Sequence, residues 1–136
     1  MKLYLPAFCA LFFIANLAFA QVEKTIAFDS AGVKVEYNWS PSDKKDDKSS
    51  RQLCLILTNS NDHIVSFTFT LQFLINNEVF EEGIAQTFCI KAGKSLKGKK
   101  YGLCWISEEI SNSEMDTESF SWRLGNKQLE KKEACD

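Results

Sequence analysis

Apolar and polar residues alternate along most of the chain beyond residue 20, and a period of two predicts β-strands rather than helices. The clearest run is 64–75 (IVSFTFTLQFLI), where serine, threonine and glutamine separate the apolar positions. Its apolar face consists of Val65, Phe67, Phe69, Leu71, Phe73 and Ile75. A strand of this length would extend about 40 Å, so we expect it to bend or to contain a β-bulge.

The same alternation predicts shorter strands at residues 22–29, 33–39, 53–58, 78–82, 84–90, 101–110 and 120–124. The segment 53–58 (LCLILT) is apolar on both faces, which is typical of a central strand. In the 84–90 strand, Ile84, Phe88 and Ile90 are expected to point inward. We expect the last strand to end at Gly125-Asn126, a turn-forming pair.

Turn-forming and charged segments separate these strands. The chemistry of Asn59–Asp62 predicts a turn, and Asn76-Asn77 predicts a hairpin. Residues 42–50 (SDKKDDKSS) contain no apolar side chain, so we expect a mobile loop there. Residues 108–118 are polar and acidic and are expected to form another loop.

About seven short strands with turn signals between them favour one fold class over the others. That class is all-β, as an antiparallel two-sheet sandwich rather than a barrel. No internal repeat or linker divides the chain after residue 20. We therefore expect a single β-sandwich domain over residues 21–136.

The order of strands and turns over residues 55–105 carries a resemblance. An apolar strand ends in Thr-Asn-Ser, then come a polar turn, an F-x-F-x-L-x-F strand, an Asn-Asn turn and a strand leading to A-G-K-S. This order resembles the central part of bacterial extracellular immunoglobulin-like modules, such as FxLyD-type domains. Ala92 stands where such modules usually have proline. The resemblance implies an immunoglobulin-like sandwich that serves in adhesion, as a spacer or in binding.

The first 20 residues predict a cleaved signal peptide. Lys2 is the only charge before Glu23, an apolar run follows it, and the run ends in Ala18-Phe19-Ala20. Pro6 and Asn16 interrupt the run, which argues against a membrane anchor. Cys9 lies too early for lipidation. We expect a periplasmic or secreted protein with no stable membrane anchor after cleavage.

The charge balance limits the partners. The full chain has a net charge of −2, which becomes −3 when Lys2 leaves with the signal. A protein that binds nucleic acid in general is strongly basic, so we expect no nucleic-acid partner.

Four cysteines remain after residue 20: Cys54, Cys89, Cys104 and Cys135. An even number in a small exported chain predicts two disulfides. No C-x-x-C pair is present to place two zinc ligands on one turn. We expect no metal site and no cofactor.

Strand order favours one of the three possible pairings. If the last two strands form a hairpin, Cys104 lies opposite the neighbourhood of Arg123, and residue 135 comes near residue 92. This arrangement favours Cys89–Cys135, which leaves Cys54–Cys104 to cross between the second and sixth strands, as in immunoglobulin-like domains. The alternatives stay open: Cys54–Cys89 with Cys104–Cys135, and Cys89–Cys104 with Cys54–Cys135.

No pattern points to catalysis. His63 follows Asp62 in a predicted turn, and the chain contains no G-x-S-x-G motif. The pairs Glu81-Glu82 and Glu108-Glu109 are adjacent, and adjacent side chains on a strand point to opposite faces. We therefore expect no catalytic residue and no enzymatic activity.

Two features are candidates for binding. Five lysines lie within ten residues, a stretch in which Gly93 and Gly98 keep the backbone open: Lys91, Lys94, Lys97, Lys99 and Lys100. They suit a protein or an anionic surface polymer, or else they form a solvated edge that blocks strand pairing. Trp39 ends its strand beside Ser40-Pro41, and an exposed tryptophan there would suit a sugar or a protein.

These features predict a non-enzymatic, exported module for binding or interaction. The alternative is a carbohydrate-binding or inhibitor-type domain that uses Trp39 or the lysine-rich loop 91–100.

Overall fold

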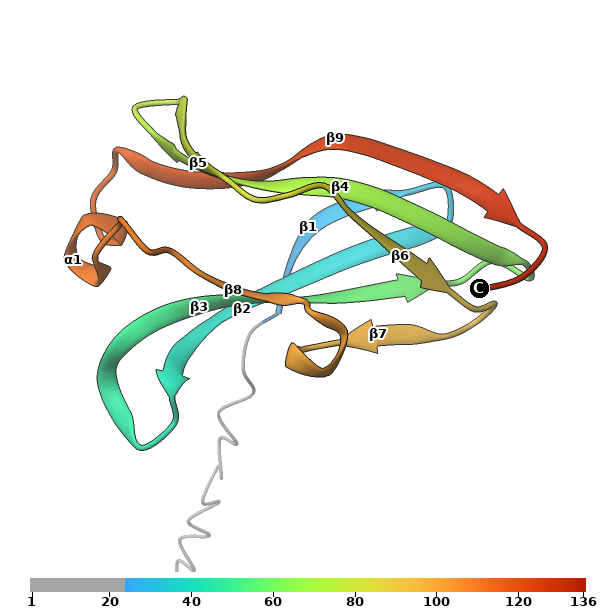
Figure 1. The fold of residues 1–136 in the computed structure, drawn as a ribbon, viewed down its shortest axis with the longest axis horizontal. Helices are drawn as coiled ribbons and strands as arrows, with labels where there is room; N and C mark the ends of the chain where they lie inside the picture. The colour runs from blue at the N-terminus through green and yellow to red at the C-terminus, as the bar shows by residue number, and fades with distance from the viewer. Residues whose placement is uncertain (1–23) are drawn as a thin grey trace, which may run out of the picture.

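The computed structural model describes residues 24–136, and the predicted signal peptide lies outside them. Within the described residues, two antiparallel sheets pack face to face, which confirms the all-β class (Figure 1). Sheet A contains β1 (Thr25–Ser30), β2 (Val33–Asp43), β3 (Asp46–Asn59), β7 (Ser95–Lys97) and β8 (Cys104–Ile106). Sheet B contains β4 (Ile64–Ile75), β5 (Glu78–Glu82), β6 (Gln86–Ile90) and β9 (Phe120–Lys132).

One long strand lies at the centre of each sheet. In sheet A, β3 pairs with β2 on one side and with β7 and β8 on the other. In sheet B, β4 pairs with β9 on one side and with β5 and β6 on the other. Two short helices, η1 (Lys99–Tyr101) and α1 (Asn112–Met115), lie in the connections before and after β8.

The core forms where these two central strands face each other, as the alternation predicts. Apolar side chains at every second position of β3 and β4 are buried, because successive residues of a strand point to opposite faces. The fully buried ones are Leu53, Leu55, Leu57 and Phe67, and Phe69 is 1% exposed. The expected irregularity of the long strand is present, since its pairing with β9 shifts register between Thr68 and Thr70.

Several expected boundaries are wrong. Residues 42–50 are not a loop, because β2 and β3 continue through them to a turn between Asp43 and Asp46. The Ser49 hydroxyl holds this hairpin tip, because it donates to the backbone oxygen of Asp46 at 2.7 Å and accepts from the Asp43 N–H at 3.0 Å. Ile84 does not point inward: it lies before β6 and is 87% exposed.

The last strand does not end at Gly125-Asn126. Strand β9 runs on to Lys132, and Gly125 lies within it, opposite Thr70 of β4. A Cβ atom at Gly125 would lie 2.6 Å from Gln72 Nε2 and 2.9 Å from Thr70 Oγ1. A glycine is required at this position because the side chains of Thr70 and Gln72 occupy the space that a side chain at residue 125 would need.

The hairpin turn at Asn76-Asn77 is confirmed. Their φ angles are 51° and 64°, the left-handed values that a two-residue hairpin turn requires and that asparagine tolerates. The acidic segment 108–118 contains α1, whose first turn is capped by the Ser111 hydroxyl accepting from the Glu114 N–H.

Both favoured disulfides are present, but the reasoning behind them is wrong. The last two strands do not form a hairpin, since β8 pairs with β3 in sheet A while β9 pairs with β4 in sheet B. Cys54–Cys104 does not cross between the sheets: the two residues lie directly opposite each other on β3 and β8, with Cα atoms 4.1 Å apart.

The second bridge, Cys89–Cys135, ties the chain end to sheet B. Cys89 lies on β6 beside Ser66 of β4, and Ser66 pairs on its other side with Glu130 of β9. The tail after β9 therefore returns across β4 to reach β6, and it lines a hollow with Ser66 and Thr87.

Candidate functional site

The candidate site is the lysine segment, residues 91–100, which connects β6 to η1 along the edge of sheet A (Figure 1). The structure places the five predicted residues on the surface, all of them exposed: Lys91, Lys94, Lys97, Lys99 and Lys100. The first two flank the turn before β7, the third lies on β7, and the last two lie in η1. All five therefore follow one continuous stretch of the sheet edge.

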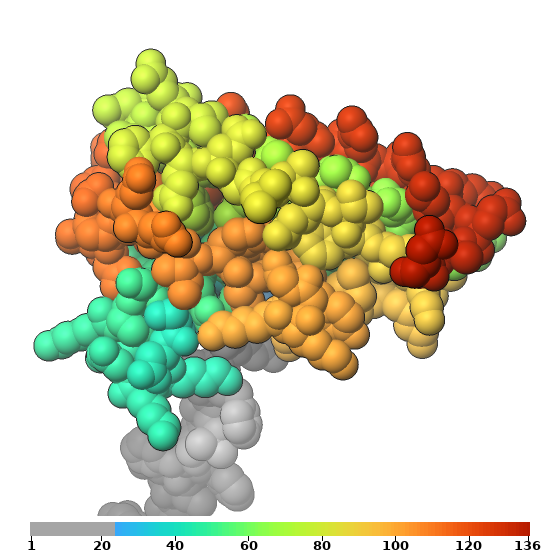
Figure 2. Space-filling view, in the orientation of Figure 1, coloured from blue at the N-terminus to red at the C-terminus, as the bar shows by residue number. Residues whose placement is uncertain are grey.

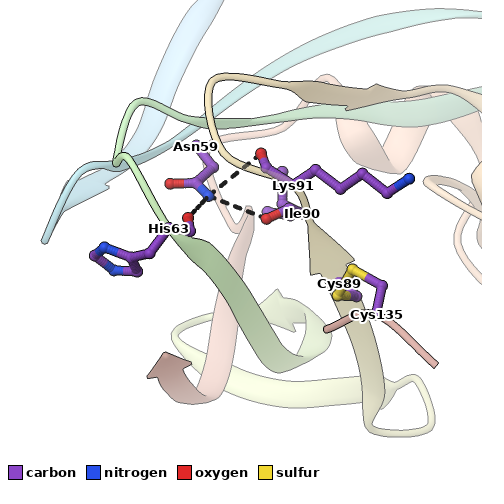
Figure 3. The surroundings of a disulfide bond; sticks show 6 residues. All are labelled: Asn59, His63, Cys89, Ile90, Lys91 and Cys135. Atoms are coloured by element: carbon purple, nitrogen blue, oxygen red, sulfur yellow. Dashed lines mark hydrogen bonds between the residues drawn. A yellow bond between two sulfur atoms is a disulfide. The ribbon is translucent and has the colours of Figure 1, made fainter. Parts of the chain in front are cut away.

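A buried amide holds the first turn of the lysine segment. Asn59, the last residue of β3, is fully buried, and its Nδ2 donates to the backbone oxygens of His63 at 2.8 Å, Ile90 at 3.0 Å and Lys91 at 3.4 Å (Figure 3). Its backbone N–H donates to Lys94 O at 3.0 Å. In Figure 3 the Lys91 side chain extends away from this cluster, so the backbone is fixed while the charge stays in solvent.

Sheet pairing at Lys97 and the backbone conformation of Gly98 hold the C-terminal end of the lysine segment. Lys97 pairs with Ile56 of β3. Gly98 has φ 75° and ψ −164°, a conformation open essentially to glycine alone, and its carbonyl accepts from Leu103 N–H at 3.1 Å. Leu103 O in turn accepts from Leu55 N–H at 2.8 Å. The segment is thus tied to β3 at both ends and in the middle.

The charges of the lysine segment have no counter-ion within the part of the chain that the structure describes. None of its five lysines lies within 4.0 Å of a carboxylate of residues 24–136. Lys100 Nζ lies 5.5 Å from the ring centroid of Tyr101, a cation–π distance. A partner would therefore not have to break an internal ion pair to bind here.

Sequence reasoning missed two lysines that belong with this surface. Lys44 and Lys45, at the tip of the β2–β3 hairpin, line a shallow hollow of about 530 Å³ together with Lys99. Figure 2 shows the hairpin beside the segment that follows β7. The lining of the hollow also includes Ser42, Asp43 and Gln52. Residues 42–50 contain no apolar side chain, so the sequence has no alternating pattern there that would predict a hairpin or its position near η1.

Trp39 lies elsewhere, on the inner face of β2. It is half-buried, stacks on Phe73 with ring centroids 6.1 Å apart, and meets Phe120 at 6.0 Å. It lines a cleft of about 370 Å³ between the open edges of the sheets, with Tyr37 and Trp122. The structure does not bring Trp39 together with the lysine segment, because β3 lies between β2, which carries Trp39, and β7.

The aromatic cleft has no flat platform at its centre. The rings of Tyr37 and Trp122 meet at 76°, edge to face, with centroids 4.7 Å apart. A second cleft of about 300 Å³ shares these two rings and continues past Ile26 and Lys127. A stacked sugar needs a flat exposed face, and this geometry suits an inserted side chain better.

The predicted turn and carboxylate residues have local partners. His63 Nδ1 lies 3.2 Å from Asp62 Oδ1, and the Asn59 side chain accepts from Asn61 N–H at 3.0 Å, as turn chemistry predicts. Glu81 accepts from the Ser107 hydroxyl, whereas Glu82 accepts from Gln72 at 2.9 Å. The two adjacent carboxylates therefore bond to different partners, Ser107 and Gln72, and do not converge. Within residues 24–136, no three histidine, cysteine or acidic side chains gather as metal ligands.

One ion pair joins the hairpin to the loop before β9. Arg51 donates through both terminal nitrogens to Asp116, with Nη2 3.1 Å from Oδ2. This hydrogen bond lowers the pKa of Asp116 and raises that of Arg51. Asn112 Oδ1 accepts from Arg51 N–H at 2.9 Å, so the short helix α1 is tied to β3 at the same residue.

Comparison with known proteins gives no relative: no protein-family model, curated protein or solved structure matches the chain. No helix in the described part of the chain is long and apolar enough to cross a membrane.

Proposed function

We propose that this chain is an exported, non-enzymatic, immunoglobulin-like module that binds an anionic partner through the lysine segment. The observation that carries the proposal is a set of five exposed lysines, without a counter-ion among residues 24–136, on a backbone that is fixed to β3. A fixed backbone lowers the entropy that binding must remove, and unpaired charges attract an anionic partner over long distances. The partner class is an acidic protein or an anionic surface polymer.

Two further features support export. Both cysteine pairs are bridged, and disulfides persist in oxidising compartments outside the cytosol. The apolar run that ends in Ala18-Phe19-Ala20 provides the route. Mass spectrometry of the exported protein should show an N-terminus at Gln21 and no free thiol.

A binding experiment with a matched control tests the proposal. Purified residues 21–136 are titrated with polygalacturonate and with polyglutamate, with neutral dextran as the uncharged polymer. We expect salt-dependent binding to a polyanion and none to dextran. The test variant is K97E/K99E/K100E, and we expect it to bind at least about tenfold more weakly, a loss of about 1.4 kcal/mol.

The control variant K127E/K131E/K132E changes the net charge by the same amount on β9 in sheet B. We expect it to bind nearly as the unmodified protein does. If both variants lose binding equally, attraction follows net charge alone and the proposed site is wrong.

A second candidate function uses the aromatic cleft, and Trp39 is the residue that carries it. The cleft holds half-exposed aromatic rings beside Arg51 and Met115, which suits an inhibitor-type contact with an apolar side chain of another protein. Trp39→Phe keeps the packing against Phe73 and removes the larger ring. Loss of a protein partner with this variant, but not with K97E/K99E/K100E, would favour the second candidate.

A further inference from the structure

The hollow between the β2–β3 hairpin and η1 combines two kinds of polar group. Lys44, Lys45 and Lys99 supply positive charge from segments more than 50 residues apart. Ser42 and Gln52 supply neutral hydrogen-bonding groups from β2 and β3. The one carboxylate in the lining, Asp43, accepts from the Lys45 backbone N–H at 2.9 Å and so belongs to the turn.

Gln52 is the unusual member of this set. Its side chain points to the outer face of sheet A, yet it is only 7% exposed. Its Nε2 donates to the Ser40 hydroxyl at 3.2 Å, while its Oε1 has no hydrogen-bond partner among residues 24–136. A buried carbonyl without a donor is costly, and a ligand that supplies the donor recovers that cost.

The two kinds of group together indicate the ligand chemistry. Lysine ammonium groups bind a carboxylate, sulfate or phosphate as point charges. An unpartnered amide oxygen calls for a hydroxyl or amide donor in the same ligand. An acidic sugar unit has both, because its ring carries hydroxyl groups next to its anionic group. A bare phosphate chain has only the charge.

We propose that this hollow binds an acidic sugar unit of an anionic polysaccharide, with Lys44, Lys45 and Lys99 on the anionic group and Gln52 Oε1 accepting from a ring hydroxyl. The proposal rests on the proposed function and deepens it, since Lys99 belongs to the lysine segment. Solvent does not reach Gln52 Oε1 in the free protein, so the proposal requires side chains of the hollow to rearrange when the sugar binds.

Two variants of the disulfide-bonded protein (residues 21–136) separate charge from hydroxyl recognition. K44A/K45A removes the charge that the hairpin contributes, and K91A/K94A removes the same charge at the far end of the lysine segment. With polygalacturonate as the probe, we expect K44A/K45A to weaken binding by about tenfold and K91A/K94A by less than about threefold.

Gln52→Met removes the acceptor and keeps side-chain length and net charge. We expect it to weaken binding to polygalacturonate at least about fivefold and to leave binding to polyphosphate unchanged. Circular dichroism confirms that each variant is folded, and Gln52→Glu serves as a second variant, because its added carboxylate should weaken both probes.

Each outcome decides something different. If K97E/K99E/K100E loses binding but K44A/K45A and Gln52→Met do not, the lysine segment binds without this hollow, and the sugar proposal is overturned while the proposed function stands. If Gln52→Met weakens both probes equally, or if polyphosphate or single-stranded DNA binds more tightly than polygalacturonate, the ligand is not a sugar. If no polyanion binds, both proposals fall.

Discussion

Two glutamines on the outer faces of the two sheets are equally buried but differ in their hydrogen bonds. Gln52 lies on the central strand of sheet A and Gln72 on the central strand of sheet B, and each is 7% exposed. Gln72 has partners at both ends of its amide, since Oε1 accepts from Arg123 Nε at 2.6 Å and Nε2 donates to Glu82 at 2.9 Å. Within the described part of the chain, Gln52 has a partner only for its Nε2.

The difference extends to the faces around them. On sheet B, the Thr68 and Thr87 hydroxyls bond to each other, and Gly125 leaves space for Gln72. On sheet A, the charges of the lysine segment have no counter-ion in the part of the chain that the structure describes. Polar groups that satisfy one another stabilise the fold. Gln86 Oε1, on β6 of sheet B, also has no hydrogen-bond partner among residues 24–136, so an unpartnered amide oxygen marks a binding face only where free charges lie beside it. Burial alone does not separate the two cases.

The largest expected effect comes from the most fully bonded amide, Asn59. Asn59→Ala removes the side-chain donor to the buried carbonyl of Ile90 and releases the turn of the lysine segment. We expect a loss of about 3 kcal/mol in the free energy of unfolding, measured by urea denaturation of the disulfide-bonded protein. Asn38→Ala, on β2, is the control and should cost less than about 1 kcal/mol. If the two variants lose equal free energy of unfolding, the hydrogen bonds of the Asn59 side chain do not account for its contribution to stability.

Gly125→Ala tests whether the polar network of sheet B is as tightly packed as the distances indicate. The new Cβ would displace the Gln72 amide, so we expect a loss of about 2 kcal/mol. Gly83→Ala is the control, because a Cβ there meets only Leu71 O at 3.7 Å. In a Gln72→Ala background the cost of Gly125→Ala should fall by at least half. If Gly125→Ala costs as much in the Gln72→Ala background as in the unmodified protein, the loss does not come from contact with Gln72.

The matched pair Gln72→Met and Gln52→Met tests the comparison itself. Gln72→Met removes two hydrogen bonds, and we expect it to lower the free energy of unfolding by about 1.5 kcal/mol. Gln52→Met removes one bond and one unsatisfied carbonyl, so the change should lie within about 0.5 kcal/mol of zero. Thermal and urea denaturation of both variants shows which of the two loses more free energy of unfolding. A larger loss at Gln52 would mean that its carbonyl has a partner in solution.

The smallest expected effect concerns the exposed pair of Arg51 and Asp116. The pKa of Asp116 lies below its usual value of 3.8, so its contribution to stability is present above that value and is lost as the pH falls through the lowered pKa. Arg51 stays protonated throughout and adds no pH dependence. In Asp116→Asn, the decline of stability below pH 4 should be slightly shallower, and Glu118→Gln is the control. An identical acid profile would show that solvent screens the pair completely.

Local sequence determined most of the fold because burial imposes a period of two. The run from Val65 to Ile75 shows one face to the core, and this predicted β4 and its irregularity. The hairpin tip between Asp43 and Asp46 was not predictable in this way, since it lies outside the core and needs no apolar side chain. The three residues of β8 are too few to reveal which sheet they join.

The candidate site was predictable only in part. Five lysines in ten residues stand out in any reading of the sequence, and the structure places them on one edge. The contribution of Lys44, Lys45 and Gln52 depends on how the hairpin lies relative to η1, which is tertiary structure. Asn59 reads as a turn residue, and only its burial shows that it holds the lysine turn in place.

The two disulfides have a consequence for proteolysis. Their loops, 54–104 and 89–135, overlap in sequence, so a single backbone cleavage anywhere between residues 54 and 135 leaves the two fragments covalently joined. The lysine segment lies where the loops overlap, and a trypsin-like protease that nicks it releases nothing until the bridges are reduced. The hairpin tip lies outside both loops. A cut after Lys44 would leave residues 24–44 held only by strand pairing and packing.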